Sequence, residues 1–299
     1  MSISPPAAVA GLAALADNYD VILSDVWGVV HDGRTHTPAA ADALARFRAK
    51  GGTVVLVTNA PRPWKPIQKM LDNFGLPRES YDVIVSSGGV TVDLVAARGM
   101  TPLHHIGPPR DLPIFEEVAE VTGEKPPLLP LEQAEYVVCT GLLDDYDEPD
   151  PYMPKLRAMR ARDLTMICAN PDIVVHVGPD LLWCAGALAE RYAGLGGKVI
   201  MAGKPHAIIY EAALKEAQAL RKGALDRKRV LAIGDGLFTD IRGAASQGLD
   251  ALFITSGIHR DLLHPDAGED DWSVDEVAYR GLLAEAGAAP AGHLRDLVW

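Results

Sequence analysis

Residues 21–33 read Val-Ile-Leu-Ser-Asp-Val-Trp-Gly-Val-Val-His-Asp-Gly, a short apolar run that ends in an aspartate and a loop punctuated by glycine. Open α/β sheets place their chemical groups at the carboxyl ends of such buried strands. Similar apolar runs are followed by Thr58-Asn59, by Lys204 and by Gly234-Asp235-Gly236. Because the carboxyl ends of parallel strands share one edge of a sheet, these polar residues are candidates for a single site.

Strands alternate with helices along most of the chain, which predicts βαβ units and an α/β fold with a Rossmann-like, mainly parallel sheet. Strands are predicted at residues 21–24, 53–58, 82–86, 103–106, 136–140, 164–169, 173–177, 199–202, 229–233 and 251–254. Helices are predicted at residues 7–16, 38–50, 66–74, 113–122, 153–162, 181–195, 206–221, 239–247 and 274–286.

The candidate chemical residues are confined to two parts of the chain. They lie before about residue 60 and after about residue 203, and the block between contributes none of them. This distribution is typical of a domain inserted into another. We therefore predict a Rossmann-like core domain made of residues 1–85 and 200–299, with an α/β cap domain inserted at residues 86–199.

The composition limits the classes of function. The chain has 299 residues, 48% of them apolar, and can bury a large core in one big domain or two modest ones. A formal net charge of −12 argues against a nucleic-acid partner, which needs a clustered basic face. The apolar stretch 7–16 is too short to span a bilayer, and no basic segment precedes it, so we expect no membrane partner.

The cysteines indicate the redox compartment. Cys139, Cys168 and Cys184 are widely spaced and show no metal-ligand or disulfide pattern. Such usage is typical of a reducing compartment, so we expect a cytoplasmic protein whose cysteines are ordinary core residues.

Asp25 is a candidate nucleophile. A carboxylate attacks phosphorus poorly unless a cation and anion-binding donors neutralise and align the phosphoryl group. Asp235 supplies a second carboxylate for Mg²⁺, and Asp240 follows it one helical turn later. Magnesium keeps several waters, so two or three protein oxygens suffice, and a backbone carbonyl of the 25–28 loop is a candidate for the third. The set predicts a magnesium-assisted phosphoryl-transfer site.

Two further positions complete this prediction. Thr58-Asn59 offers a hydroxyl, an amide and backbone N–H groups to phosphate oxygens, and Lys204 offers a positive charge. Each residue alone has an ordinary explanation: Lys204 as a solvated lysine, Thr58 as a cap, and Asp240 as a partner of a helix dipole. The ordered set, with each member after an apolar strand, favours a site.

These motifs resemble those of the haloacid dehalogenase superfamily of Mg²⁺-dependent phosphohydrolases. The resemblance is finer to its class IIA members, which carry a large α/β cap between the second and third motifs. The phrases that carry it are Asp25–Val29 through Gly33 and Pro38, Val57–Asn59, Ala169–Asp172, Ala202–Pro205 and Gly234–Ile241. It extends over about residues 20 to 257, and the order of the motifs makes it specific.

The resemblance implies a role for each matching residue. Asp25 is the nucleophile that forms an aspartyl-phosphate, and Lys204 stabilises the phosphoryl group. The implied metal ligands are Asp25, Asp235, Asp240 and the backbone carbonyl of Trp27. The residues expected to bind phosphate or substrate are Thr58, Asn59, Gly28 and Asn170. The resemblance also implies a small phosphorylated metabolite as substrate and a homodimer formed through the cap.

Trp27 departs from the family pattern. In the phosphatases this position holds an aspartate that protonates the leaving alkoxide and later activates water, and an indole N–H does neither. General acid–base catalysis contributes about 10²–10⁴-fold, or roughly 3 to 5 kcal/mol of barrier. We therefore expect slow turnover of ordinary alkyl esters, or a substrate with a good leaving group such as an acyl or aryl phosphate. His31 and Asp32, on the same loop, are the candidates to replace the missing acid.

Two alternatives remain open. A degenerate relative would bind Mg²⁺ and phosphate, or become phosphorylated, without turnover, and would act as a regulatory module. A dehalogenase-like hydrolase would need no acid for its halide leaving group, which suits an aromatic residue at position 27. The presence of both Asp235 and Asp240 favours a metal and a phosphate over dehalogenation.

Overall fold

The protein, described by a computed structural model, is defined over residues 5–177, 180–265 and 272–299. The chain divides into two compact units. Unit 1 consists of Met1–Thr58, Gln68–Val85 and Tyr210–Trp299, and unit 2 consists of Asn59–Ile67 and Ser86–Ile209. The predicted core and cap boundaries at residues 86 and 199 stay a prediction. The units differ from them in that residues 59–67 and 200–209 group with unit 2.

Unit 1 is built on a six-stranded sheet, within the described residues, in the order β12-β11-β10-β1-β2-β3. The strands are β1 (Val21–Asp25), β2 (Thr53–Thr58), β3 (Val83–Ser86), β10 (Val230–Gly234), β11 (Asp250–Ile254) and β12 (Gly292–Leu294). The pairs from β12 to β2 are parallel, with Asp25 opposite Val57 and Ser24 opposite Ile233. Every residue of β1 is buried, as an inner strand covered on both faces requires.

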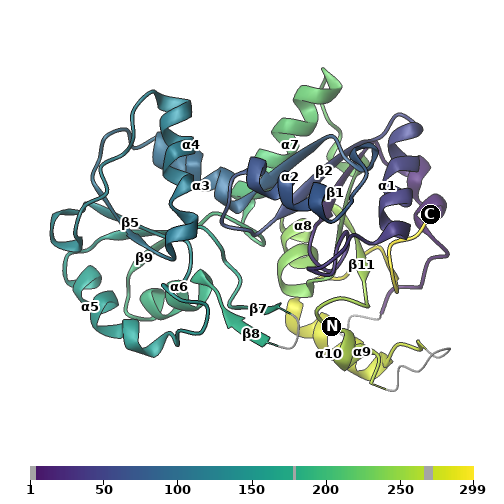
Figure 1. Cartoon of the computed structure of the whole chain (residues 1–299). Coiled ribbons are helices and arrows are strands. Elements are labelled where there is room, and N and C mark those ends of the chain that lie inside the picture. The colour runs from purple at the N-terminus through teal and green to yellow at the C-terminus, as the bar shows by residue number, and fades with distance from the viewer. Residues whose placement is uncertain (1–4, 178–179, 266–271) are drawn as a thin grey trace. The chain divides into compact units, whose positions relative to one another are not determined.

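Helices connect these strands in the predicted alternation (Figure 1). They are α1 (Pro38–Ala49), α2 (Trp64–Asn73), α7 (Ala207–Arg221), α8 (Arg242–Ser246), α9 (Arg260–Leu263) and α10 (Glu276–Ala286), and a π-helical turn, η8 (Leu237–Ile241), precedes α8. Proline's fixed φ suits the first position of a helix, and α1 begins with Pro38 as predicted. The alternation and the parallel pairing confirm the predicted α/β class.

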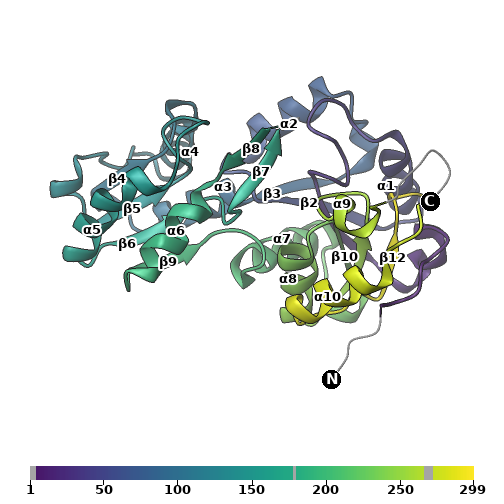
Figure 2. The ribbon, with the colours of Figure 1, turned by 90° about the horizontal axis from the view of Figure 1, so that it is seen from below.

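Unit 2 contains a second parallel sheet, in the order β4-β5-β6-β9 (Figure 2). Its strands are β4 (Leu103–Ile106), β5 (Tyr136–Cys139), β6 (Thr165–Cys168) and β9 (Lys198–Met201). Its helices are α3 (Ser87–Ala96), α4 (Pro113–Thr122), α5 (Met153–Ala161) and α6 (Ala185–Gly194). The strands β7 (Val174–Val177) and β8 (Asp180–Trp183) form an antiparallel pair after β6.

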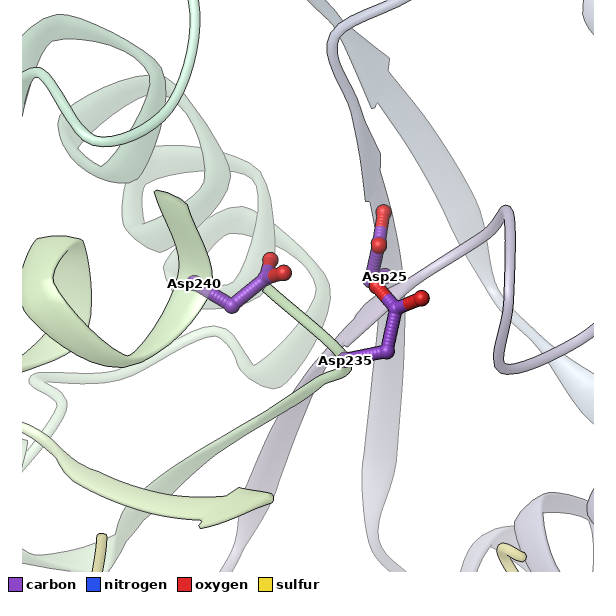
Figure 3. A group of neighbouring side chains, drawn as sticks. All are labelled: Asp25, Asp235 and Asp240. Atoms are coloured by element: carbon purple, nitrogen blue, oxygen red, sulfur yellow. The ribbon is translucent and has the colours of Figure 1, made fainter. Parts of the chain in front are cut away.

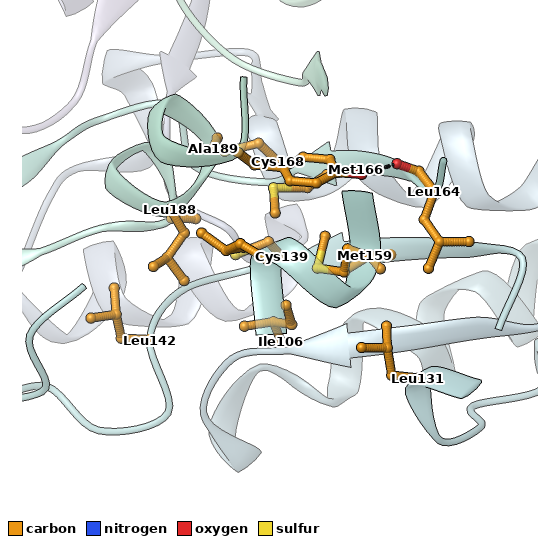
Figure 4. Close-up of a cluster of buried hydrophobic side chains, with 14 residues drawn as sticks. Ile106, Leu131, Cys139, Leu142, Met159, Leu164, Met166, Cys168, Leu188 and Ala189 are labelled. Carbon is orange, nitrogen blue, oxygen red and sulfur yellow. Dashed lines mark hydrogen bonds between the residues drawn. The ribbon is translucent and has the colours of Figure 1, made fainter. Parts of the chain in front are cut away.

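Each face of this second sheet packs against its own pair of helices. Val138 of β5 belongs to the apolar cluster that contains residues of α3 and α4, and its neighbour Cys139 belongs to the cluster of α5 and α6. Successive side chains of a strand point to opposite faces, which explains the split. Figure 4 shows the second cluster, in which Cys139 and Cys168 lie among aliphatic side chains. Burial raises the pKa of the Cys139 thiol to about 12, so it is an inert core residue.

β4 carries two adjacent histidines, His104 and His105. His104 Nδ1 contacts the carbonyl oxygen of Leu129 at 3.0 Å, and His105 Nε2 contacts the hydroxyl of Thr140 at 2.9 Å. The His105 ring also packs edge-to-face on Phe115. Burial lowers the pKa of His105 to about 4, with a smaller contribution from His104, so the ring is neutral at physiological pH.

The helix predicted over residues 181–195 is wrong at its start. Residues 180–183 form β8, in which Trp183 pairs with Val174 and Leu182 with Val175. The helix begins only at Ala185. Its second residue, Gly186, packs closely on the chain after β6, because a Cβ there would lie 2.2 Å from the carbonyl oxygen of Pro171. The apolar residues 181–183 fit a strand as well as a helix, and their pairing with β7 decides the outcome.

The helix predicted over residues 7–16 is also wrong. The segment forms short 3₁₀ turns, η1 (Leu12–Ala14) and η2 (Ala16–Asn18), and Ala8 pairs with His293. A Cβ on Gly11 would lie 2.4 Å from the carbonyl oxygen of Trp299, so the segment is shaped by contacts with the C-terminal residues. Among the described residues, no helix is long and apolar enough to cross a membrane.

His105 makes the stability of the folded protein depend on pH. The unfolded chain has an ordinary histidine pKa near 6.5 and binds a proton more readily than the folded protein does, so stability falls as pH falls from about 6.5 towards 4. Between pH 7 and pH 5 the expected loss from His105 is on the order of 2 kcal/mol. His105→Gln, which keeps a donor for Thr140 and cannot titrate, should reduce this loss in urea unfolding followed by circular dichroism. An unchanged loss would contradict the assignment.

Candidate metal and phosphate site

Three aspartates gather in unit 1. One carboxylate oxygen from each of Asp25, Asp235 and Asp240 lies within 4.8 Å of the others, and Figure 3 shows the three side chains pointing toward one another. Their exposed fractions are 8%, 7% and 4%. The structure therefore brings together three of the residues that the sequence singled out as metal ligands.

The sheet order places these carboxylates side by side. Asp25 is the last residue of β1, and Asp235 directly follows β10, the parallel neighbour of β1. Asp240 lies in η8, and its carboxylate accepts a hydrogen bond of 3.1 Å from the N–H of Gly236. Because β1 and β10 run in the same direction, their carboxyl ends deliver Asp25 and Asp235 to one edge.

Glycines make room for the carboxylates. A Cβ on Gly28 would lie 2.1 Å from Asp235 Oδ2, and one on Gly257 would lie 2.0 Å from the same atom. A Cβ on Gly234 would lie 2.1 Å from Asp240 Cγ. Gly28 also has a φ of +79°, which favours glycine. These close approaches fix the positions of Asp235 and Asp240.

Backbone amides orient the carboxylates of Asp25 and Asp235. Val26 N–H donates to Asp25 Oδ1 at 2.7 Å, and Ile258 N–H donates to Asp235 Oδ2 at 2.8 Å. Two carboxylates at this separation repel each other by about 3 kcal/mol at an effective dielectric constant of 20. An all-oxygen, acidic donor set fits a hard divalent cation such as Mg²⁺, which would relieve the repulsion.

Trp27 packs back onto its own loop. Its ring lies edge-to-face on His31, with 5.0 Å between the ring centroids, and a Cβ on Gly33 would lie 2.7 Å from the indole. The N–H of Gly28 donates to the carbonyl oxygen of His31 at 2.9 Å and closes the same loop. The predicted binding of phosphate by Gly28 stays a prediction.

The two candidates to replace the missing acid, His31 and Asp32, both accept hydrogen bonds from backbone N–H groups of their own loop. His31 is buried, its Nδ1 accepts a hydrogen bond from Gly33 N–H at 2.9 Å, and burial lowers its pKa to about 4. Asp32 is exposed and accepts from the N–H groups of Arg34 and Thr35, which lowers its pKa. At neutral pH one is an uncharged imidazole and the other a carboxylate, so neither is suited to protonate a leaving group.

Lys204 and Asn59 form a second group, in unit 2. Lys204 is 4% exposed, so it is no solvated surface lysine. Its N–H donates to Asn59 Oδ1 at 2.7 Å, and Asn59 Nδ2 donates to the Lys204 carbonyl at 3.1 Å and to Asp172 Oδ1 at 2.8 Å. A Cβ on Gly203 would lie 2.3 Å from Asn59 Oδ1. The Asn59 side chain therefore positions the backbone of Lys204, and its predicted contact with phosphate stays a prediction.

The remaining predicted residues are Thr58, at the end of β2, and Asn170, two residues after the end of β6. Thr58 is buried at the end of β2, one residue beyond the Asp25–Val57 pair of unit 1. Asn170 follows β6 in unit 2, and its Oδ1 accepts a hydrogen bond from Asp172 N–H at 3.1 Å. The side-chain oxygen of Asn170 thus closes a turn, and its predicted contact with substrate stays a prediction.

Sequence reasoning missed Gly257 and Ile258, which hold Asp235. Both follow β11, the strand beside β10, so the rule that located Asp25 and Asp235 also applies to them. Tyr210 was missed as well, and its hydroxyl donates to the Asp240 carbonyl at 3.1 Å. A tyrosine in the first turn of a predicted helix gives no signal of this contact.

Gly257→Ala tests the carboxylate cluster without removing a ligand. The added methyl group would displace the Asp235 carboxylate, so we expect the affinity for Mn²⁺ to fall about 10-fold or more in calorimetric titration. Gly281→Ala in α10 is the matched control, because nothing lies within 4 Å of the added Cβ. Equal affinity in the two variants, both folded by circular dichroism, would show that the cluster does not bind the ion.

Two segments of the chain match known family models. Residues 22–119 match the model described as haloacid dehalogenase-like hydrolase, and residues 201–278 match one described as HAD-hydrolase-like. A solved hydrolase of the haloacid dehalogenase-like family from Brucella suis 1330 is 44% identical. That comparison covers 96% of this chain and 99% of the other, with a TM-score of 0.81.

More distant relatives carry named activities. A 5'-nucleotidase of Bacillus subtilis is 23% identical over 87% of this chain and 96% of its own length. The solved glycerol phosphate phosphatase of Mycobacterium tuberculosis, in complex with magnesium, is 24% identical with a TM-score of 0.63. It is matched over 84% of this chain and 73% of its own.

Proposed function

This chain belongs to the haloacid dehalogenase-like hydrolase family, and we propose that it is a Mg²⁺-dependent phosphohydrolase of small phosphorylated metabolites that acts through Asp25. The resemblance drawn from the ordered motifs, and the prediction of an enzyme of this family, are confirmed. The observation that carries the proposal is the buried cluster of Asp25, Asp235 and Asp240. The named activities of the nucleotidase and of the glycerol phosphate phosphatase support the phosphatase assignment.

The metal would be held by residues of unit 1. The proposed ligands are Asp25, Asp235 and the backbone carbonyl of Trp27. Asp240 would complete the acidic surroundings of the ion, because one of its carboxylate oxygens lies within 4.8 Å of those of Asp25 and Asp235. Bound Mg²⁺ supplies positive charge that neutralises the phosphoryl oxygens. The magnesium complex of the glycerol phosphate phosphatase supports this choice of ion. A backbone carbonyl serves as a ligand whatever the side chain at position 27.

Asp25 performs the covalent chemistry in this proposal. One carboxylate oxygen attacks phosphorus, the bond from phosphorus to the leaving oxygen breaks, and an aspartyl-phosphate forms. Water then attacks the phosphorus, which releases inorganic phosphate and restores the carboxylate. Thr58 donates its hydroxyl to a phosphoryl oxygen, and Lys204 supplies a positive charge that Asn59 holds in place through its backbone.

Trp27 restricts which phosphates react quickly. Its indole has no titratable group, and His31 and Asp32 are committed to the loop. An alkoxide would therefore leave without a proton, which is slow. Aryl and acyl phosphates leave as stabilised anions and avoid this step, so we propose that they are the faster substrates.

Trp27 also supports a second candidate function. A protein that forms the aspartyl-phosphate but lacks a base to activate water would stall after one turnover and act as a phosphorylated regulatory module. Release of one equivalent of leaving group followed by a stop would favour this module, whereas sustained turnover favours the hydrolase. Dehalogenation gains no support from the cluster, because a halide displacement has no use for three carboxylates.

The partner that we propose is a small phosphorylated metabolite. We propose no nucleic-acid or membrane partner and a cytoplasmic location, on the charge and composition of the chain. The homodimer through the cap stays a prediction, and sedimentation of the purified protein tests it.

Asp25→Asn tests the nucleophile. We expect phosphate release from 4-nitrophenyl phosphate and acetyl phosphate, with Mg²⁺ present, to fall by about 10³-fold or more, because an amide does not attack phosphorus. Asp42→Asn, an exposed aspartate paired with Arg46 on α1, is the control and should keep wild-type activity. Activity in Asp25→Asn equal to that of the control would remove the proposal. Chelation of Mg²⁺ should abolish the activity of the wild-type protein and of Asp42→Asn.

Trp27→Asp tests the missing acid. Restoring a carboxyl group should raise kcat for an alkyl ester such as glycerol 3-phosphate by about 10²–10⁴-fold and change kcat for acetyl phosphate far less. Trp27→Phe is the control, because it alters the packing on His31 without adding an acid. If Trp27→Phe gains as much as Trp27→Asp, the effect comes from space around the ring and the acid explanation fails.

A further inference from the structure

The turn η8 joins the two aspartates that follow β10. Asp235 precedes this turn, and Asp240 lies within it. The N–H of Ile241 donates to the carbonyl oxygen of Gly236 at 3.1 Å, which is the π-helical pattern. The first N–H groups of a helical turn have no partner inside the turn. The N–H of Leu237, the first residue of η8, therefore needs an acceptor from another part of the chain.

His259 supplies this acceptor. Its Nε2 accepts a hydrogen bond from Leu237 N–H at 3.3 Å. His259 follows β11, the strand beside β10, so the bond links the loops at the ends of two neighbouring strands. Burial lowers the pKa of His259, against a smaller opposing contribution from Asp240, so the imidazole is neutral at physiological pH. With its proton on Nδ1, the neutral ring offers Nε2 as an acceptor.

Aromatic contacts fix the ring of His259. It packs edge-to-face on Phe238 of η8, with 5.8 Å between the ring centroids, and lies 6.2 Å from the ring of Phe253 of β11. The guanidinium of Arg242 lies over the Phe238 ring at 5.2 Å, and it also donates to carbonyl oxygens at the end of α10. The imidazole thus rests on groups that are held in place themselves, which orients Nε2 in advance.

Two consecutive residues hold the segment that carries both aspartates. Ile258 N–H donates to Asp235 Oδ2 at 2.8 Å, and the next residue, His259, holds the first N–H of the turn that contains Asp240. The hydroxyl of Tyr210, on α7, donates to the Asp240 carbonyl at 3.1 Å and holds the other end of the turn. Loss of the Nε2 acceptor would leave a donor unpaired at the start of the turn and let that end shift.

We propose that His259 is a positioning residue of the metal site, whose Nε2 fixes the turn that carries Asp240 relative to Asp235. It acts through Leu237 and touches neither carboxylate in this role. The inference rests on the proposed function only in taking the aspartate cluster to bind a divalent cation. Mg²⁺ demands near-ideal octahedral geometry, so a shift of the turn should weaken its binding. Groups that orient metal ligands commonly change metal affinity by about 10- to 100-fold.

Two amide substitutions at position 259 test the acceptor. Glutamine Oε1 is separated from Cα by as many bonds as histidine Nε2, so His259→Gln can keep the bond to Leu237 N–H. Asparagine Oδ1 is nearer to Cα and does not reach it. In calorimetric titration with Mn²⁺, we expect His259→Asn to bind about 10- to 100-fold more weakly than the wild-type protein. His259→Gln should stay within about threefold of the wild-type affinity.

His293→Asn is the matched control. His293 is another half-buried histidine of unit 1, and it packs on Tyr279 and contacts the carbonyl oxygen of Pro6 through Nδ1 at 3.1 Å. This variant should keep the wild-type affinity for Mn²⁺. Circular dichroism checks folding. If His259→Asn fails to fold, His259→Leu answers instead, because it keeps an apolar side chain against the phenylalanines and has no acceptor.

The contrast between the two amides separates positioning from packing. Neither amide has a ring, so a role in packing alone would lower the stability of both variants and leave their Mn²⁺ affinities alike. Equal affinities in the two variants, whether unchanged or weakened together, overturn the positioning role and leave the proposed function standing.

Hydrolysis of 4-nitrophenyl phosphate distinguishes the remaining outcomes. In His259→Asn the Mg²⁺ concentration that gives half-maximal activity should rise by about the same factor as the Mn²⁺ dissociation constant, with kcat at saturating Mg²⁺ changed by less than about threefold. The expected Mn²⁺ affinities without any hydrolysis by the wild-type protein would support the positioning role and overturn the phosphatase. A wild-type protein that binds no Mn²⁺ would overturn both.

Discussion

The close approach of three buried carboxylates is the constraint on which the candidate site depends. One carboxylate oxygen from each of Asp25, Asp235 and Asp240 lies within 4.8 Å of the others, and backbone amides and close glycines hold the side chains there. Such an acidic set of oxygen donors fits a hard divalent cation. We propose that a cation bound here, at the edge of a parallel sheet, faces a phosphoryl group.

The residues proposed for the chemistry come from both units. Unit 1 carries the proposed nucleophile and metal ligands, whereas unit 2 carries Lys204 and Asn59, which positions the backbone of Lys204. In the proposed mechanism Trp27 sets how readily the leaving oxygen departs, so substitutions at this position should appear in kcat.

Local signals predicted most of the fold and part of the site. β2 and β4 have the predicted bounds because continuous apolar runs bounded by turn residues admit few alternatives. β8 was predicted as helix because its pairing with β7 is a tertiary choice. α3 was missed because Gly88 and Gly89 open it, and their place is set by close contact with Arg62 and by the cap of Ser86. The hold of Asn59 on Lys204 depends on residues distant in sequence, which no local pattern encodes.

The most direct measurement is a crystal structure of the protein grown with Mn²⁺ and beryllium fluoride, a mimic of the phosphoryl group, with anomalous scattering used to locate the metal. The account predicts a single strong anomalous peak in ligand contact with Asp25 and Asp235, and the mimic bonded to the carboxylate of Asp25. A peak elsewhere, or Asp25 turned away from Asp235 with neither ion nor mimic between them, would contradict it.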